Sequence, residues 1–112
     1  MNGNNETENR QLFDAKRAKH VVGKLILIGL TYIDNKGHIT KQKQIYGKII
    51  SIDKSKISIG LQGTHQGELF NLPPDIPALK EAQLGDYHLR ETGEIVTNPD
   101  LLVTYDINSS SE

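Results

Sequence analysis

Histidine and carboxylate side chains carry most of the reactive chemistry available to this chain of 112 residues. The four histidines are His20, His38, His65 and His88, and none lies two or four residues from another. Two imidazoles that share a metal commonly have that spacing, and the pattern His-Glu-x-x-His is absent. The chain also has no cysteine, which excludes disulfides, thiol catalysis, cysteine zinc sites and iron–sulfur clusters. We therefore expect neither a metal nor a cofactor.

Acidic residues gather in the second half of the chain, several of them beside turn prolines or glycines. They are Asp75, Glu81, Asp86, Glu91, Glu94, Asp100 and Asp106. A pair of carboxylates performs general acid–base catalysis if burial separates the two pKa values. Aspartate beside proline or glycine also holds backbone amides in turns, and this interpretation is favoured for Asp75 and Asp100. Since a nucleophile elbow and a phosphate-binding loop are absent as well, the sequence predicts a protein that is not an enzyme.

Lysines form the clearest charge pattern. The net charge is −1, yet residues 34–56 hold six lysines against two aspartates, and the chain beyond them is strongly acidic. Lys36, Lys41 and Lys43 flank one expected turn, Lys54 and Lys56 flank the next, and Lys48 lies between them. Such a basic rim, with Tyr46 beside it, could meet RNA or DNA phosphates. Readers of single strands stack bases on aromatic rings, however, and only 5% of this chain is aromatic. Lysines on a polar strand also protect a sheet edge from aggregation, which we consider the stronger interpretation.

Most of the chain has the composition and spacing of β-strands. Residues 39–52 are expected to form one long strand, with a polar first half and Gly47 at a bend. Residues 57–61 alternate apolar and small side chains, as in a strand with one buried face. Turns rich in glycine, proline and aspartate separate the remaining strands. These are expected at 21–33, 68–72, 86–90, 94–97 and 101–107.

This pattern predicts an all-β fold, with a single small antiparallel SH3-like barrel over residues 21–107. Residues 1–20 are expected to form a flexible or short-helical N-terminal arm, and residues 108–112 a frayed tail. The predicted core consists of Leu25, Leu27, Ile49, Ile50, Ile52, Ile57, Ile59, Leu61, Leu72, Leu89, Ile95 and Leu102.

Two resemblances accompany this prediction. Residues 47–53, followed by 57–61, are similar to the bent central hairpin of SH3-like and Sm-like barrels. Residues 72–75, 85–90, 92–96 and 98–100 together resemble a family of small bacterial proteins without a known activity. That resemblance covers roughly residues 25–106, and it implies a bacterial domain of this type with no catalytic function.

The function that these observations favour is non-catalytic binding of another protein or of a second copy. Opposite charges on two regions of one domain suit self-association or a partner with a matching pattern. Tyrosine and arginine are favoured anchors at interfaces, which selects Tyr87 and Arg90. The alternative is RNA binding through the lysine rim, and an enzyme that uses Asp75 and Asp100 is the least favoured. The candidate binding residues are Tyr46, Lys41, Lys43, Lys48, Tyr87 and Arg90.

The first twenty residues contain charged side chains and no apolar segment, so a signal peptide is not expected. The longest apolar stretch, residues 25–30, is far shorter than the ~20 residues that cross a bilayer. We therefore expect a cytoplasmic protein without a membrane partner.

Overall fold

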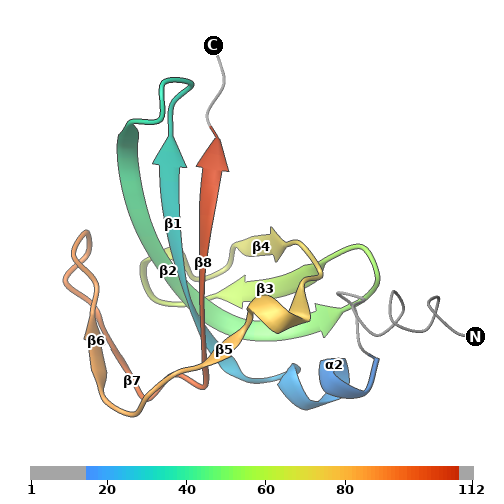
Figure 1. Ribbon diagram of the computed structural model, residues 1–112. Coiled ribbons are helices and arrows are strands. Elements are labelled where there is room, and N and C mark those ends of the chain that lie inside the picture. Colours follow the sequence, from blue (N-terminus) through green and yellow to red (C-terminus); the bar gives the residue numbers. More distant parts are fainter. Residues whose placement is uncertain (1–14, 109–112) are drawn as a thin grey trace, which may run out of the picture.

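The computed structural model describes residues 15–108, which form a mostly β structure with one short helix (Figure 1). The all-β prediction is confirmed. The elements, in chain order, are α2 (Ala15–Val21), β1 (Leu25–Ile33), β2 (Ile39–Ile52), β3 (Ile57–Leu61), the 3₁₀ turn η1 (Gly63–His65), β4 (Leu69–Leu72), the 3₁₀ turn η2 (Ile76–Ala78), β5 (Lys80–Glu81), β6 (Asp86–His88), β7 (Ile95–Thr97) and β8 (Leu101–Asn108).

Six strands form one sheet in the order β4-β3-β2-β1-β8-β5, and β6 and β7 form a separate hairpin. The predicted closed antiparallel barrel is wrong on two counts. The sheet remains open, because β4 and β5 lie at its opposite edges and β5 has only two residues, both paired with β8. The central strand β1 also runs parallel to β8, while it is antiparallel to β2.

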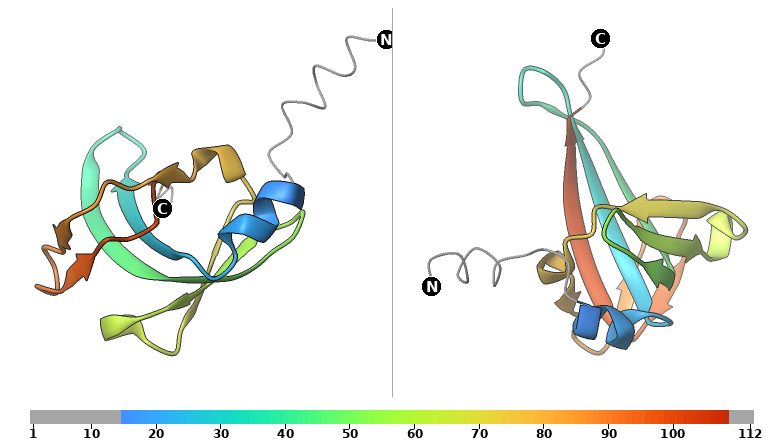
Figure 2. Two further views of the ribbon diagram at one scale, coloured as in Figure 1. Left: turned by 90° about the horizontal axis from the view of Figure 1, so that it is seen from below. Right: turned by 90° about the vertical axis from the view of Figure 1, so that its right-hand side faces the viewer.

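Strand β2 changes partners halfway along its 14 residues. Residues 39–48 pair with β1, whereas β3 pairs with β2 only between Gly47 and Ile52. At Gly47 the two backbones approach so closely that a Cβ atom would overlap with the carbonyl oxygen of Gly60 on β3. Beyond this point residues 29–33, 39–44 and 104–108 form a three-stranded ribbon, which we call the arm. Figure 2 shows the arm standing away from β3 and β4.

Aspartates hold the turns at the two ends of β2. Asp34 Oδ1 accepts hydrogen bonds from the amides of Lys36 and His38, both at 2.9 Å. Asp53 Oδ1 accepts from the amides of Ser55 and Lys56 at 2.8 and 3.0 Å. This is an Asx turn, in which an aspartate side-chain oxygen holds the backbone amides that follow it.

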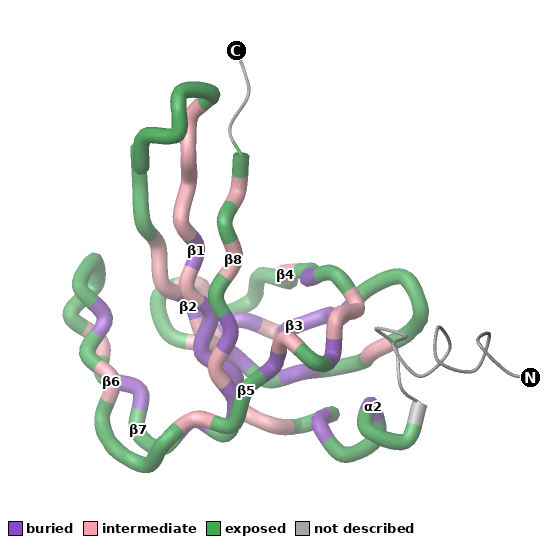
Figure 3. Tube along the Cα trace, in the orientation of Figure 1, coloured by how far each residue is buried: buried purple, intermediate pink, exposed green. Residues whose placement is uncertain are grey.

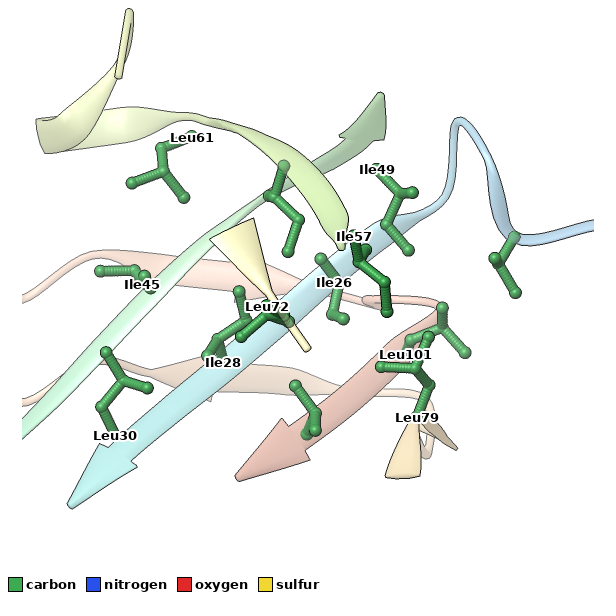
Figure 4. Packing of buried hydrophobic residues seen from close by; sticks show 13 residues of the cluster. Ile26, Ile28, Leu30, Ile45, Ile49, Ile57, Leu61, Leu72, Leu79 and Leu101 are labelled. Atoms are coloured by element: carbon green, nitrogen blue, oxygen red, sulfur yellow. The ribbon is translucent and has the colours of Figure 1, made fainter. Parts of the chain in front are cut away.

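The sheet buries side chains on both faces, because alternate residues of β1 point to opposite sides. Ile26, Ile28 and Leu30 belong to the main core, which β2, β3, β4 and β8 complete (Figure 4). Leu25 and Leu27 face a smaller cluster formed with the β6–β7 hairpin. Figure 3 shows that burial concentrates where β1, β2 and β8 cross β3, whereas the tip of the arm is exposed.

Helix α2 docks on the main core, which explains how so short a helix is stable. Ala18 and Val21 are 6% and 4% exposed. The guanidinium of Arg17 donates a hydrogen bond to the carbonyl of Leu79 at 3.2 Å. Of the two alternatives for the N-terminal segment, the short helix is therefore present over Ala15–Val21. Residues 1–14 and 109–112 lie outside the described part of the chain.

Seven of the predicted core residues are buried, namely Leu27, Ile49, Ile57, Ile59, Leu61, Leu72 and Leu89. Leu25, Ile52 and Leu102 are half-buried. The prediction is wrong for Ile50 and Ile95, which are 53% and 52% exposed. Ile50 lies where the β2–β3 register shifts, so its side chain leaves the core face. Ile95 is next to Val96, and it is Val96 that enters the small cluster.

Substitution of two isoleucines tests this division between core and surface. We expect Ile59→Ala, at a fully buried position, to lower the free energy of unfolding by about 2–5 kcal/mol. The same change at Ile95 should cost no more than about 1 kcal/mol, since half of that side chain is already in water. Urea unfolding followed by circular dichroism measures both. Equal losses at the two positions would contradict the described packing.

Candidate functional site

The β6–β7 hairpin packs on the face of the sheet that points away from the main core. Leu89 and Val96 insert against Leu27 of β1, with Tyr87 and Leu102 around them. The turn that follows β6 is closed by a hydrogen bond from the Gly93 amide to the Leu89 carbonyl at 2.9 Å. The backbone amide of Arg90 then donates to Gln44 Oε1 on β2 at 3.1 Å. The hairpin turn is thereby fixed beside the base of the arm.

A polar groove of about 320 Å³ lies between this turn and the arm. Its floor is open because Gly29, which has no side chain, stands in register between Gln44 of β2 and Thr104 of β8. A Cβ atom at Gly29 would lie 3.3 Å from the methyl group of Thr104. The residues that line the groove are Gly29, Leu30, Thr31, Gln42, Lys43, Gln44, Arg90, Glu91 and Thr104.

The groove presents hydrogen-bonding groups and no aromatic ring. Arg90 and Glu91 are exposed, and neither forms an ion pair within residues 15–108. Because Gln44 Oε1 already accepts from the Arg90 amide, the Gln44 NH₂ group is left as a donor. Guanidinium and amide donors together suit a carboxylate, which guanidinium binds in a two-pronged geometry. The arrangement can hold a polar anionic group, but it places no nucleophile beside a base.

Tyr46 and Glu94 form a second connection between the β6–β7 hairpin and β2. The Tyr46 hydroxyl donates to Glu94 Oε2 at 3.0 Å, and the Thr64 amide donates to the same oxygen at 3.0 Å. We call these three residues the latch. Gly63 permits it, since a Cβ atom there would overlap with both the Tyr46 hydroxyl and the Glu94 carboxylate.

The latch shifts the pKa of both ionisable groups. Hydrogen bonding to Thr92, and then to Tyr46 and Thr64, lowers the pKa of Glu94 below its ordinary value of 4.5, although partial desolvation opposes this. Partial burial, followed by the hydrogen bond and the charge of Glu94, raises the pKa of Tyr46. Both shifts favour a carboxylate that accepts from a neutral phenol.

The six predicted binding residues do not form one surface. Arg90 and Lys43 both border the groove, although alternation along β2 directs the Lys43 side chain to the face opposite to Gln42 and Gln44. Tyr46 is engaged in the latch, and the Tyr87 hydroxyl donates to the Gln83 carbonyl at 2.8 Å. The Lys41 ammonium lies 5.8 Å from the centre of the Tyr32 ring. Lys48 is exposed and pairs with Leu25, away from the arm.

The single lysine rim is a wrong prediction. The two turns that carry it lie at opposite ends of β2, separated by about 43 Å of extended strand at about 3.3 Å per residue. Lys41 and Lys43 also alternate with Tyr46 along β2, so they point to the other face of the sheet. The edge interpretation fits better, since β3 pairs only from Gly47 onwards and leaves the first half of β2 at an edge.

Seven groove residues were not among the predicted site residues, namely Gly29, Leu30, Thr31, Gln42, Gln44, Glu91 and Thr104. Alternation alone places Gln42 and Gln44 on one face of β2. Gly29 and Thr104 join them only through the register of three strands, two of which lie far apart in the chain.

The two aspartates weighed between catalysis and turn formation behave differently. Asp100 Oδ2 accepts from the Leu25 amide at 2.9 Å, which agrees with a role in holding backbone. The Asp75 side chain makes no capping hydrogen bond to η2. Burial, and to a smaller extent the charge of Asp75, raises the pKa of Tyr105. Tyr105 has a buried hydroxyl that finds no hydrogen-bond partner in the described chain.

Protonation of Glu94 at low pH should weaken the hydrogen bonds of the latch. Because the pKa of Glu94 is lowered in the folded protein, its stabilising effect is complete above pH 4.5 and is lost as the pH falls through the folded value. NMR titration of the Thr64 amide should therefore show a midpoint below 4.5. In Tyr46→Phe one hydrogen bond to the carboxylate is lost, so the midpoint should rise towards 4.5.

The Ser55 amide, which donates to Asp53 instead, provides the internal control for this titration. Its midpoint should be the same in both proteins. An identical Thr64 midpoint with and without the Tyr46 hydroxyl would contradict the latch.

Within residues 15–108, no group of three or more histidine, aspartate or glutamate side chains is placed to hold a metal ion. No helix in this part of the chain is long and apolar enough to cross a bilayer. Comparison of the chain with protein families, curated proteins and solved structures finds no match.

Proposed function

We propose that this protein is a non-catalytic binding module that holds a carboxylate-bearing segment of another protein in the groove beside Arg90. The observation that carries the proposal is an exposed guanidinium that has no ion-pair partner within residues 15–108, at the rim of the groove. Arginine is favoured both for binding carboxylates and for anchoring interfaces.

The size of the groove supports a small part of a protein as the ligand. A volume of about 320 Å³ lies at the lower end of the ~300–1,000 Å³ that is typical of ligand pockets. An acidic side chain or a chain terminus fits such a space. Glu91 adds an acceptor at the same rim, which can take a peptide N–H next to the bound carboxylate.

The support of the hairpin also favours binding. Leu89 is 2% exposed. The next residue, Arg90, is fixed by the hydrogen bond that its backbone amide donates to Gln44 Oε1. Tyr87 packs in the same cluster and anchors the other end of β6 through Gln83. The backbone that carries the guanidinium is thus fixed before a ligand arrives, so its ordering adds no entropy cost to binding.

Substitution of Arg90 tests this function. The probes are two short peptides, one with a single glutamate and a free carboxy terminus, the other with glutamine and an amidated terminus. We expect the acidic peptide to shift the NMR signals of the Gln44 and Arg90 amides, and the neutral peptide to leave them unchanged. Arg90→Gln should weaken binding about tenfold or more, the effect of one charge-assisted hydrogen bond.

Lys54→Gln is the matched control, because it removes one positive charge from an exposed position at the far end of β2. Its affinity should remain that of the unmodified protein. Equal weakening by both changes would reduce the effect to overall charge, and binding that is indifferent to Arg90 would contradict the proposal.

RNA binding is the second candidate, and it is favoured by two rows of residues in register across the arm, which contain Lys41 and Lys43. On the core-side face of the arm Lys41, Tyr32 and Ile107 stand in register, and Lys43, Leu30 and Tyr105 form the next row. Lysines beside half-exposed tyrosines are the combination that single-stranded nucleic acids require. Tyr46 has no part in this candidate, since it lies on the opposite face.

The two candidates respond to different substitutions. If the arm binds RNA, affinity for a mixed-sequence oligonucleotide falls steeply with salt, and Lys41→Ala with Lys43→Ala weakens it without changing thermal stability. The double change Lys54→Ala with Lys56→Ala is the control of equal charge. Fluorescence anisotropy at two salt concentrations measures both, and equal affinities for the two double variants would exclude the arm as the RNA site.

A further inference from the structure

The unpaired edges of the six-stranded sheet in the described chain differ in charge, and the outermost strand on one side, β5, consists of Lys80 and Glu81. The first half of β2 carries Lys41 and Lys43, while β8 beyond Leu102 carries Asp106. Strand β4, at the end of the strand order, has the sequence Leu-Phe-Asn-Leu and no charged residue. Charged side chains on an edge discourage pairing with another chain, so β4 is the edge without that protection.

The backbone of β4 has hydrogen-bonding groups directed outward. The Leu61 amide donates to the Glu68 carbonyl at 2.9 Å, which makes this a hydrogen-bonded pair of the β3–β4 ladder. Antiparallel ladders alternate, so the peptide groups of Phe70 and Leu72 also point to β3. Those of Leu69 and Asn71 point away from the sheet, where no described strand follows.

The side chains along this edge are also suited to contact. Leu69 is 68% exposed and lies in register with Gly60, over which the 53% exposed Ile50 extends. The two form an apolar patch on one face of the sheet, and Lys48, which is also in register with Gly60, borders it. On the other face Phe70 packs only partly against the main core. Asn71 is held in place by a hydrogen bond to the Ser58 hydroxyl at 3.2 Å.

We propose that β4 is a self-association edge, at which a second copy of this chain adds its own β4 in antiparallel orientation, centred on Phe70. In this register Leu69 of each copy faces Asn71 of the other, and these residues exchange amide-to-carbonyl hydrogen bonds. The two Phe70 side chains face each other across the two-fold axis. No like charges oppose each other, because β4 has none.

The pairing is self-limiting. Proline cannot donate to a ladder, and Pro73 and Pro74 end β4 directly after Leu72. A two-fold axis uses the same edge of both copies, so it leaves no second β4 edge for further growth. We therefore expect a dimer that dissociates on dilution. The groove beside Arg90 lies on other strands, and the two interactions are independent.

Sedimentation velocity over a concentration series tests the edge with two leucine substitutions. Leu69→Lys places a lysine on β4, whereas Leu84→Lys makes the same change at a residue that is 85% exposed and outside every strand. We expect the unmodified protein and Leu84→Lys to dimerise over the same concentration range. Leu69→Lys should raise the dissociation constant at least tenfold, and Arg90→Gln should leave it unchanged.

Hydrogen exchange of the unmodified protein decides the matter even if Leu69→Lys fails to fold. The Leu69 and Asn71 amides should exchange slowly at high concentration and become fast on dilution, while the Phe70 amide stays protected throughout. A protein that remains monomeric at millimolar concentration would overturn the proposal. So would a dimer in which these two amides exchange at the same rate at every concentration.

Discussion

The close approach of β2 and β3 at Gly47 is the constraint on which the rest of the structure depends. One strand of 14 residues pairs with β1 over residues 39–48 and with β3 over residues 47–52, and the change occurs where the carbonyl of Gly60 occupies the space of a side chain. On one side of this point β3 and β4 join β1, β2 and β8 around the main core. On the other side only three continue, so their second face stays open to the β6–β7 hairpin and the groove.

The groove follows from this arrangement through two further glycines and one hairpin. Gly29 leaves a gap in the open face, and the packing of Leu89 and Val96 brings Arg90 to its rim. Gly63 allows Tyr46 and Thr64 to converge on Glu94, which holds the start of β7. The proposed binding surface is therefore made of polar residues whose positions are decided by small residues and by apolar packing beneath them.

Much of the local structure could be predicted from the sequence, because it depends on neighbouring residues. The bounds of β2, the turns at Asp34 and Asp53, and the bend at Gly47 all follow from alternation and turn chemistry. The parallel pairing of β1 with β8 could not be predicted, since no local pattern records which distant strand is a neighbour. The barrel prediction fails for this reason.

The site shows the same limit. Arg90 and Lys43 could be selected by residue type, but the groove that contains them depends on Gly29, Gln44 and Thr104 meeting across three strands. The lysine rim fails because closeness in the sequence was taken for closeness in space, whereas a long strand separates its halves. The core prediction fails for Ile50 because the β2–β3 register shifts at this residue, and the alternation of apolar residues in the sequence does not reveal such a shift.

The parallel pairing of β1 with β8 affects how the nascent chain folds on the ribosome. The central strand β1 pairs with β8 only when both are available, and pairs between them, such as Ile26 with Leu101, span 75 residues. Until β8 leaves the exit tunnel, the apolar side chains of β1 lack one of their two neighbouring strands. Contacts of such long range slow folding. The nascent chain therefore completes its sheet only after β8 has left the exit tunnel, and a chain that stops before β8 displays its most hydrophobic strand to the chaperones and proteases of the cell.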